Sequence, residues 1–337
     1  MTPTPPAIVL DHVSKTYAGG SAAVSDLSLA IEPGEVMVLV GTSGSGKTTT
    51  MKMINRLVEP SSGSIRIGGR DIREIDPIQL RRSIGYVIQE IGLFPHMTVG
   101  KNIAVVPSLK GWPKARQVER VAELLELVGL PSGYAEKHPH QLSGGQKQRV
   151  GVARALAGDP NILLMDEPFG ALDPITRAQL HEEFLKLQHR LRKTVVFVTH
   201  DVLEAIRLAS RIVVLEAGKL LQVGTPREIL AQPATSKVLD LVGSDLPFKL
   251  LAVCTVEQAL EPILHQPPEA ASAMRGSDSL KDALLAMVAC GQPSLPVVNG
   301  DSALLGQITL GGLQRLVAHR ALAHPVEPSE FERTPSP

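Results

Sequence analysis

Residues 41–48 read Gly-Thr-Ser-Gly-Ser-Gly-Lys-Thr, a glycine-rich pattern that can hold phosphate groups. The loop follows an apolar run at 36–40 and opens a helical stretch from 47 to 57, which is the strand–loop–helix context that this motif requires. Glycines let backbone N–H groups surround a polyphosphate, Lys47 can reach its β and γ phosphates, and the Thr48 hydroxyl can ligate Mg²⁺. The predicted nucleotide-binding residues are Gly41, Thr42, Ser43, Gly44, Ser45, Gly46, Lys47, Thr48 and Thr49.

Two carboxylates end a second apolar run, where residues 161–165 lead directly into Asp166 and Glu167. Burying a charge without a partner is costly, so acids at the end of a buried strand suggest a function. Asp166 is placed to hold Mg²⁺ through water, and Glu167 to orient or deprotonate an attacking water. A strand that simply ends at the surface would explain the pair alone equally well. The phosphate loop favours the catalytic interpretation.

A third segment, Leu-Ser-Gly-Gly-Gln at 142–146, precedes a helical stretch from 147 to 156 and would form another anion site. Together with the two features above, it resembles the signature of the ATP-binding cassette (ABC) family, and the resemblance covers roughly residues 7–242. It implies a homodimer in which two chains pack head to tail and bury two ATP molecules. Ser143, Gly144, Gly145 and Gln146 would face the γ-phosphate held by the opposite subunit. A serine-capped helix explains part of this pattern, but not all five residues.

The resemblance assigns roles to further residues in chain order. Tyr17 would stack on adenine, Gln89 would touch Mg²⁺ and the attacking water, and His200 would contact the γ-phosphate. The loop at 171–173 would cross the dimer interface. The implied cofactors are ATP and Mg²⁺, with Lys47, Gln89, Glu167 and His200 as catalytic residues and Thr48, Gln89 and Asp166 as metal ligands. Every catalytic position is filled, which implies an active ATP hydrolase.

Residues 86–96 and 49–57 resemble the ATPases of importers for quaternary amines such as glycine betaine, carnitine or choline. In such importers Leu93, Phe94 and Pro95 would help to receive a membrane permease, although local packing also explains an apolar segment here. A separate substrate-binding protein would deliver the cargo. Two alternatives stay open: an importer for another small solute, such as an amino acid or polyamine, and a soluble non-transport ATPase. The latter usually carries a fused second cassette or a coiled-coil insertion, which this chain lacks.

Composition limits the remaining possibilities. The 337 residues suggest about two domains, and 43% of them are hydrophobic, yet no apolar run reaches the length of a transmembrane helix. The N-terminus lacks the features of a signal peptide, and two cysteines fit a reducing compartment. Lys+Arg and Asp+Glu both number 34, so bulk charge gives no reason to expect a nucleic-acid partner. We expect a peripheral protein on the cytoplasmic face of the cell membrane.

The predicted fold class is α/β. A phosphate-loop NTPase core over 7–242 would combine a mostly parallel sheet, an antiparallel β subdomain near 7–32 and a helical subdomain at about 90–158. After it, residues 243–323 would form a small α+β domain whose helix–strand–strand–helix order resembles one cystathionine-β-synthase-type (CBS) repeat. Because such repeats normally work in pairs, the two tails of a dimer would pair. The Pro- and Glu-rich residues 324–337 are predicted to be disordered.

Overall fold

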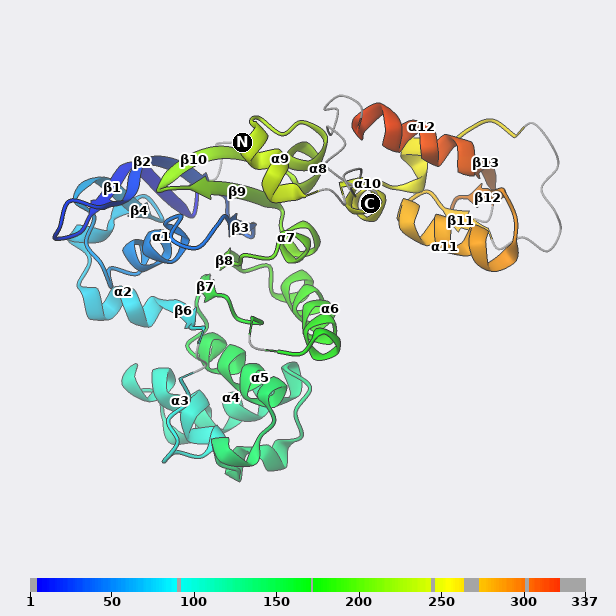
Figure 1. Cartoon of the computed structure of the whole chain (residues 1–337). Coiled ribbons are helices and arrows are strands. Elements are labelled where there is room, and N and C mark those ends of the chain that lie inside the picture. Colours follow the sequence, from blue (N-terminus) through cyan, green and yellow to red (C-terminus); the bar gives the residue numbers. More distant parts are fainter. Residues whose placement is uncertain are drawn as a thin grey trace, which may run out of the picture. The chain divides into compact units, whose positions relative to one another are not determined.

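The structure is a computed structural model that describes residues 5–89, 92–170, 172–243, 246–263, 273–300 and 303–321. Packing divides the chain into two units, residues 1–223 and 224–337 (Figure 1). The division places the short helices α8 (Pro226–Ala231) and α9 (Ser236–Val242) in the second unit. The domain limits expected at 242 and 243 stay predictions, and residues 324–337 lie outside the described part.

A six-stranded sheet forms the centre of the first unit, in the order β10-β9-β3-β8-β7-β6. Five of its strands run parallel, and its members are β3 (Val36–Val40), β6 (Ile84–Val87), β7 (Ile162–Asp166), β8 (Thr194–Val198), β9 (Arg211–Glu216) and β10 (Lys219–Gly224). Every residue of β3, β7 and β8 is buried, as expected for strands covered on both faces. The predicted mostly parallel sheet is confirmed.

A second, antiparallel sheet packs against the same core, in the order β2-β1-β4-β5. It consists of β1 (Ile8–Thr16), β2 (Ala22–Ile31), β4 (Ser62–Ile67) and β5 (Arg70–Asp71). Ile8 and Ile31 face each other across β1 and β2, and both are fully buried. They share one hydrophobic cluster with Met51 and Met53 of helix α1 (Lys47–Ile54). This helix is therefore held between the two sheets.

Helices dominate the chain between the strands β6 and β7, where they form a group of their own below the sheet in Figure 1. They are α3 (Val99–Leu109), α4 (Lys114–Leu127) and α5 (Gly144–Leu156), with 3-10 turns at Ser132–Glu136 and Pro139–Gln141. The apolar stripe of α4 is buried through Val121, Leu124 and Leu125. Asn102, fully buried on α3, donates to the Phe94 and Met97 carbonyls and so fixes the segment that leads into this group.

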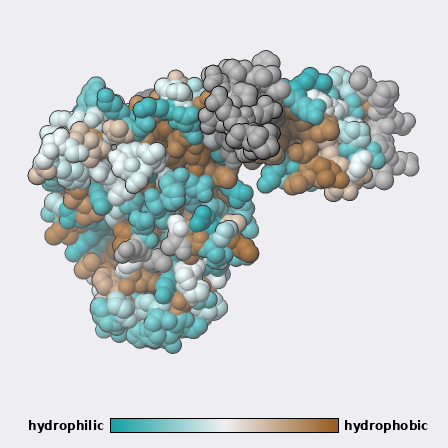
Figure 2. All heavy atoms as spheres, viewed as in Figure 1, coloured by the Kyte–Doolittle hydropathy of each residue, from teal (hydrophilic) through white to brown (hydrophobic). Residues whose placement is uncertain are grey.

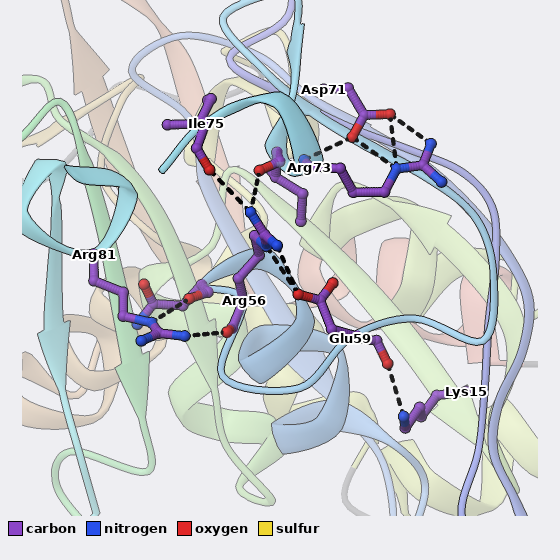
Figure 3. Close-up of polar contacts among 9 residues, drawn as sticks. Lys15, Arg56, Glu59, Asp71, Arg73, Ile75 and Arg81 are labelled. Atoms are coloured by element: carbon purple, nitrogen blue, oxygen red, sulfur yellow. Dashed lines mark hydrogen bonds and ion pairs between the residues drawn. The ribbon is translucent and has the colours of Figure 1, made fainter. Parts of the chain in front are cut away.

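A polar cluster fastens the far end of α1 (Figure 3). Arg56 follows the helix with a left-handed φ of 47°, and its Nη1 donates to the carbonyls of Ile72 and Ile75 at 2.9 Å. Its Nη2 also donates to Glu59 Oε1 at 2.9 Å, while Lys15 Nζ donates to the Glu59 carbonyl. The cluster ties the helix end to β1 and to the segment before α2 (Pro77–Ser83).

The remaining two helices of the first unit follow strands of the central sheet. Helix α6 (Pro174–Leu191) follows β7, and α7 (Val202–Leu208) follows β8. Asp173 caps α6 by accepting from the N–H of Thr176, and Asp201 caps α7 by accepting from the N–H of Leu203. Side-chain capping therefore sets where each helix begins, directly after the strand end that carries polar residues.

The second unit is a small α+β structure. After α8 and α9 come α10 (Leu246–Val253), a 3-10 turn (Val256–Ala259), β11 (Met274–Arg275), α11 (Leu280–Cys290), β12 (Ser294–Val298), β13 (Leu304–Thr309) and α12 (Leu310–Ala321). Its sheet has the order β11-β12-β13. Figure 2 shows a hydrophobic area over α11, where the side chains of Leu285 and Val288 are exposed. The relation to a CBS repeat stays a prediction.

Membrane crossing can be tested on the helices directly. Within the described ranges, no helix combines the length and apolar character needed to span a bilayer.

Candidate nucleotide site

Glycines shape the loop between β3 and α1. Gly41 and Gly46 have left-handed φ values of 152° and 99°. A Cβ atom on Gly41 would lie 2.0 Å from the Leu215 carbonyl oxygen, and one on Gly46 would lie 2.5 Å from the Ala23 carbonyl oxygen. Gly44, with φ 77°, faces open space instead. The loop thus packs tightly on its inner side and leaves its outer side accessible, as a phosphate cradle requires.

Lys47 lies inside this loop. Its ammonium donates to the carbonyls of Gly41 at 2.8 Å and Thr42 at 2.9 Å, and the side chain is buried. Burial lowers the pKa of Lys47, while the charges of Glu167 and Asp166 oppose this shift. Its hydrogen-bond partners are neutral, and among the described residues no carboxylate forms an ion pair with it, so the arrangement suits an incoming polyanion.

Thr48 and Asp166 form the second part of the site. Thr48 Oγ1 donates to Asp166 Oδ1 at 2.9 Å across the α1–β7 junction. Burial raises the pKa of Asp166, and the hydrogen bond from Thr48 opposes this shift. A hydroxyl and a carboxylate are oxygen ligands that suit Mg²⁺, which usually takes its other ligands from water and substrate phosphates. Accordingly, no cluster of three or more His, Cys, Asp or Glu side chains suited to a metal occurs in the described residues.

Glu167 is held by two side chains from neighbouring strand ends. Gln89 Nε2 donates to Glu167 Oε2 at 3.3 Å, and His200 Nδ1 lies 3.3 Å from the same oxygen. The Glu167 backbone has a φ of 42°, which is uncommon for a non-glycine residue, and its N–H donates to the Val198 carbonyl. Strained backbone at a polar strand end is typical of functional sites. The structure therefore brings together three of the predicted catalytic residues at one carboxylate oxygen.

The segment at 142–146 builds the start of α5. Ser143 Oγ accepts from the N–H of Gln146, and Gln146 Oε1 accepts from the N–H of Ser143 at 3.0 Å, which completes a capping box. Gln146 also donates to the Tyr134 hydroxyl. Gly145 is closely approached by α6, since a Cβ there would lie 2.8 Å from Thr176 Cγ2. Among the described residues, no hydrogen bond joins this segment to the phosphate loop of its own chain.

Tyr17 lies in the turn between β1 and β2. The residue is 45% exposed, and Lys15 Nζ lies 5.3 Å from the centroid of its ring. The described contacts do not link Tyr17 to the phosphate loop, so its role toward adenine stays a prediction.

Comparison with known proteins identifies the family of this chain. The sequence profile of ABC transporters matches residues 24–170. The Bacillus subtilis "Glycine betaine/carnitine/choline transport ATP-binding protein OpuCA" is 52% identical over 89% of this chain and 77% of its own length. The chain belongs to the ABC transporter family. The family expected from the sequence and the class of ATP-binding transport subunit are confirmed.

Other relatives and solved structures agree with this ABC assignment. The Escherichia coli "Glycine betaine uptake system ATP-binding protein YehX" is 50% identical over 87% of this chain and 94% of its own length. A solved ABC dimer in a post-hydrolysis state, bound to ADP and Pi, has a TM-score of 0.59 and 35% identity over 65% of this chain and 99% of its own. The predicted phosphate-loop fold is therefore confirmed.

One feature beside this ABC site is absent from the sequence-based predictions. His181 Nε2 lies 2.6 Å from Glu204 Oε1, and both side chains are buried. The only signal in the sequence is the helical spacing that places His181 among the apolar positions Leu180 and Phe184. A histidine at such a position is ordinarily a core residue, and its partner lies on a different helix.

Proposed function

We propose that this chain is the ATP-hydrolysing subunit of an ABC importer whose cargo is a quaternary-amine osmolyte such as glycine betaine, carnitine or choline. The observation that best supports ATP hydrolysis is that Gln89 and His200 both contact one carboxylate oxygen of Glu167. The cargo is supported by the names of the two relatives at 50% and 52% identity, both of which are ATP-binding proteins for glycine betaine uptake or transport.

Different residues of the site would bind the nucleotide and accept the proton of the attacking water. The loop at 41–48 and Lys47 bind the β and γ phosphates of ATP. Thr48 and Asp166, with Gln89, would hold Mg²⁺, which neutralises charge on the phosphates. Glu167 orients the attacking water and accepts its proton, while Gln89 and His200 keep the carboxylate in position. Tyr17 offers an exposed aromatic face to adenine.

The α5 start acts on the ATP of a second copy. In the described part of the chain, no hydrogen bond joins Ser143, Gly144, Gly145 or Gln146 to their own phosphate loop, and a solved relative is dimeric. In the proposed homodimer each α5 start covers the γ-phosphate bound by the other subunit. ATP favours the closed dimer and hydrolysis favours the open one, and this difference drives the membrane permease.

The partners follow from this cycle. The permease would dock beside Leu93, Phe94 and Pro95, where Phe94 is exposed and Asn102 fixes the backbone. A substrate-binding protein delivers the cargo, and the chain works at the cytoplasmic face of the membrane.

The second unit would regulate this transport. Residues 243–323 are proposed to form a CBS-like domain, supported by the order of α11, β12, β13 and α12. The exposed side chains of Leu285 and Val288 on α11 offer a surface through which two such tails would pair.

Reconstitution tests the proposal. The chain is assembled in liposomes with the permease and binding protein encoded beside it, and ATP hydrolysis is measured with and without glycine betaine. Stimulation by betaine that disappears in the matched Glu167→Gln variant supports both activity and cargo. Stimulation by amino acids or polyamines alone would discard the cargo, and failure to assemble with the permease would favour a soluble ATPase.

A further inference from the structure

A buried hydrogen bond connects the helices α6 and α7, which follow the strands β7 and β8. His181 on α6 and Glu204 on α7 approach to 2.6 Å, with side chains only 5% and 6% exposed. Helix α6 begins directly after Asp173, and α7 begins directly after His200 and Asp201. The pair therefore links the loop before α6 to the segment that carries His200.

The His181 ring also contacts the segment that follows Glu167. Its centroid lies 5.1 Å from that of Phe169 in an edge-to-face arrangement, and Phe169 follows Glu167 by two residues. Phe169 in turn contacts Phe184 and Phe197. One imidazole thus contacts both α7 and the segment after Glu167.

A second, more exposed contact joins the same elements. Arg177 Nη1 lies 3.8 Å from Asp201 Oδ2, and Arg177 Nη2 donates to the Leu172 carbonyl at 3.0 Å. Partly exposed pairs of this kind contribute little to stability and are screened by salt. The buried pair is the firmer of the two links.

The pair is poorly explained as a source of stability. His181 Nδ1 is buried and has no hydrogen-bond partner in the described part of the chain. A buried ion pair often contributes no more than well-packed apolar residues of similar volume, and an unpaired buried nitrogen adds a cost. A short directional contact of this kind does join a side chain of α6 to one of α7.

We propose that His181 and Glu204 are positioning residues for ATP hydrolysis. The pair holds the start of α7 so that His200 stays 3.3 Å from Glu167, and it makes this segment move together with the loop at Asp173. The His200 side chain is 65% exposed, so its placement depends on the backbone that carries it. The inference rests on the proposed ATPase function.

The test compares two substitutions of His181 in the full chain. His181→Leu should lower kcat by at least about 10-fold and change the KM for ATP by less than about 3-fold, because the nucleotide site is intact but the hydrolytic geometry is not. His181→Gln, whose amide can still donate to Glu204, should recover kcat to within about 3-fold of wild type. The matched control Leu180→Ala disturbs packing at a buried position of the same helix and should leave kcat unchanged.

A double variant separates positioning from folding. His181→Leu combined with Glu204→Leu removes the whole pair, so its melting temperature should equal or exceed that of the His181→Leu variant. Its kcat should fall no further than that of either single variant, because the two residues act as a unit. Wild-type kcat in the double variant, losses that add up from the His181→Leu and Glu204→Leu single variants, or an equal loss in Leu180→Ala would each overturn the proposal. A wild-type chain that does not hydrolyse ATP would instead overturn the proposed function.

Discussion

The helices α1 and α5 both begin at turns that contain glycine, yet they differ in whether a side chain caps the first turn. The residue before α1 is Gly46, and no side chain caps the helix. The residue before α5 is Ser143, which forms a complete capping box with Gln146. Both helix starts present partial positive charge, but only the first leaves its N–H groups without a side-chain acceptor.

This difference fits the two anion sites that we propose, each with a different task. The open start of α1 needs a phosphate to complete it, and the neighbouring Lys47 is already buried in the loop. The start of α5 is satisfied within its own chain by neutral side chains. It is therefore stable at a surface until a second subunit brings its γ-phosphate, as the proposed dimer requires.

The largest expected effect is at α1. Lys47→Ala should weaken ATP binding by at least about 100-fold, since a hydrogen bond to a charged group contributes about 1.5–3 kcal/mol and several are lost. Equilibrium binding to labelled ATP measures the change. Lys219→Ala, on the strand β10, is the control and should bind normally. Normal binding by Lys47→Ala would remove the contrast between the two helix starts.

The second-largest effect is expected from a negative charge added at the start of α5. Gln146→Glu preserves the capping box but places a carboxylate where the proposed dimer presents a γ-phosphate. We expect kcat to fall about 10–100-fold from like-charge repulsion, with the melting temperature unchanged or raised. Steady-state hydrolysis and thermal melting are measured together. Unchanged kcat would show that the α5 start does not meet phosphate.

Loss of the cap itself is a smaller change. Ser143→Ala should destabilise the chain by about 1 kcal/mol, measured by urea unfolding, and should also lower ATP hydrolysis. Thr225→Ala is the matched control, because Thr225 and Glu228 form the same capping box at α8. It should show a similar loss of stability with hydrolysis intact. Equal losses of hydrolysis in both variants would indicate a purely structural role for Ser143.

The smallest expected effect is a difference in pH dependence between the two capping boxes. The backbone N–H of Thr225 bonds to Glu228 and lowers the pKa of that carboxyl from 4.5. Its stabilising contribution is therefore complete above pH 4.5 and is lost as the pH falls through the lowered value. Titration by NMR of wild type and Glu228→Gln measures this. The box of Ser143 and Gln146 has no ionisable member, so α5 should not respond in that window.

Much of the site follows from the sequence because its parts are local. The glycine spacing before Lys47 and the acids after β7 are visible in single segments. Gln89 and His200 are expected beside Glu167 only from the family resemblance. The structure supplies the reason, because the three residues follow β6, β7 and β8, which are adjacent parallel strands.

Other features depend on packing between distant elements. His181 and Glu204 lie on separate helices, and their contact depends on how α6 and α7 are rotated. Arg56 meets Ile75, 19 residues away, through backbone carbonyls that any sequence could supply. Neither contact leaves a pattern in the chain, because neither requires a particular spacing of residue types.

The cluster around Arg56 makes the C-terminal end of α1 resistant to fraying. Eight residues of α-helix span about 12 Å, and last turns normally fray because their carbonyls lack partners. Here Arg81 of α2 donates to the carbonyls of Asn55 and Arg56, while Arg56 itself reaches Ile72 and Ile75 (Figure 3). Hydrogen bonds therefore hold the C-terminal end of the helix in place. We therefore expect a displacement of its phosphate end to be transmitted to α2 and not to be lost in a frayed last turn.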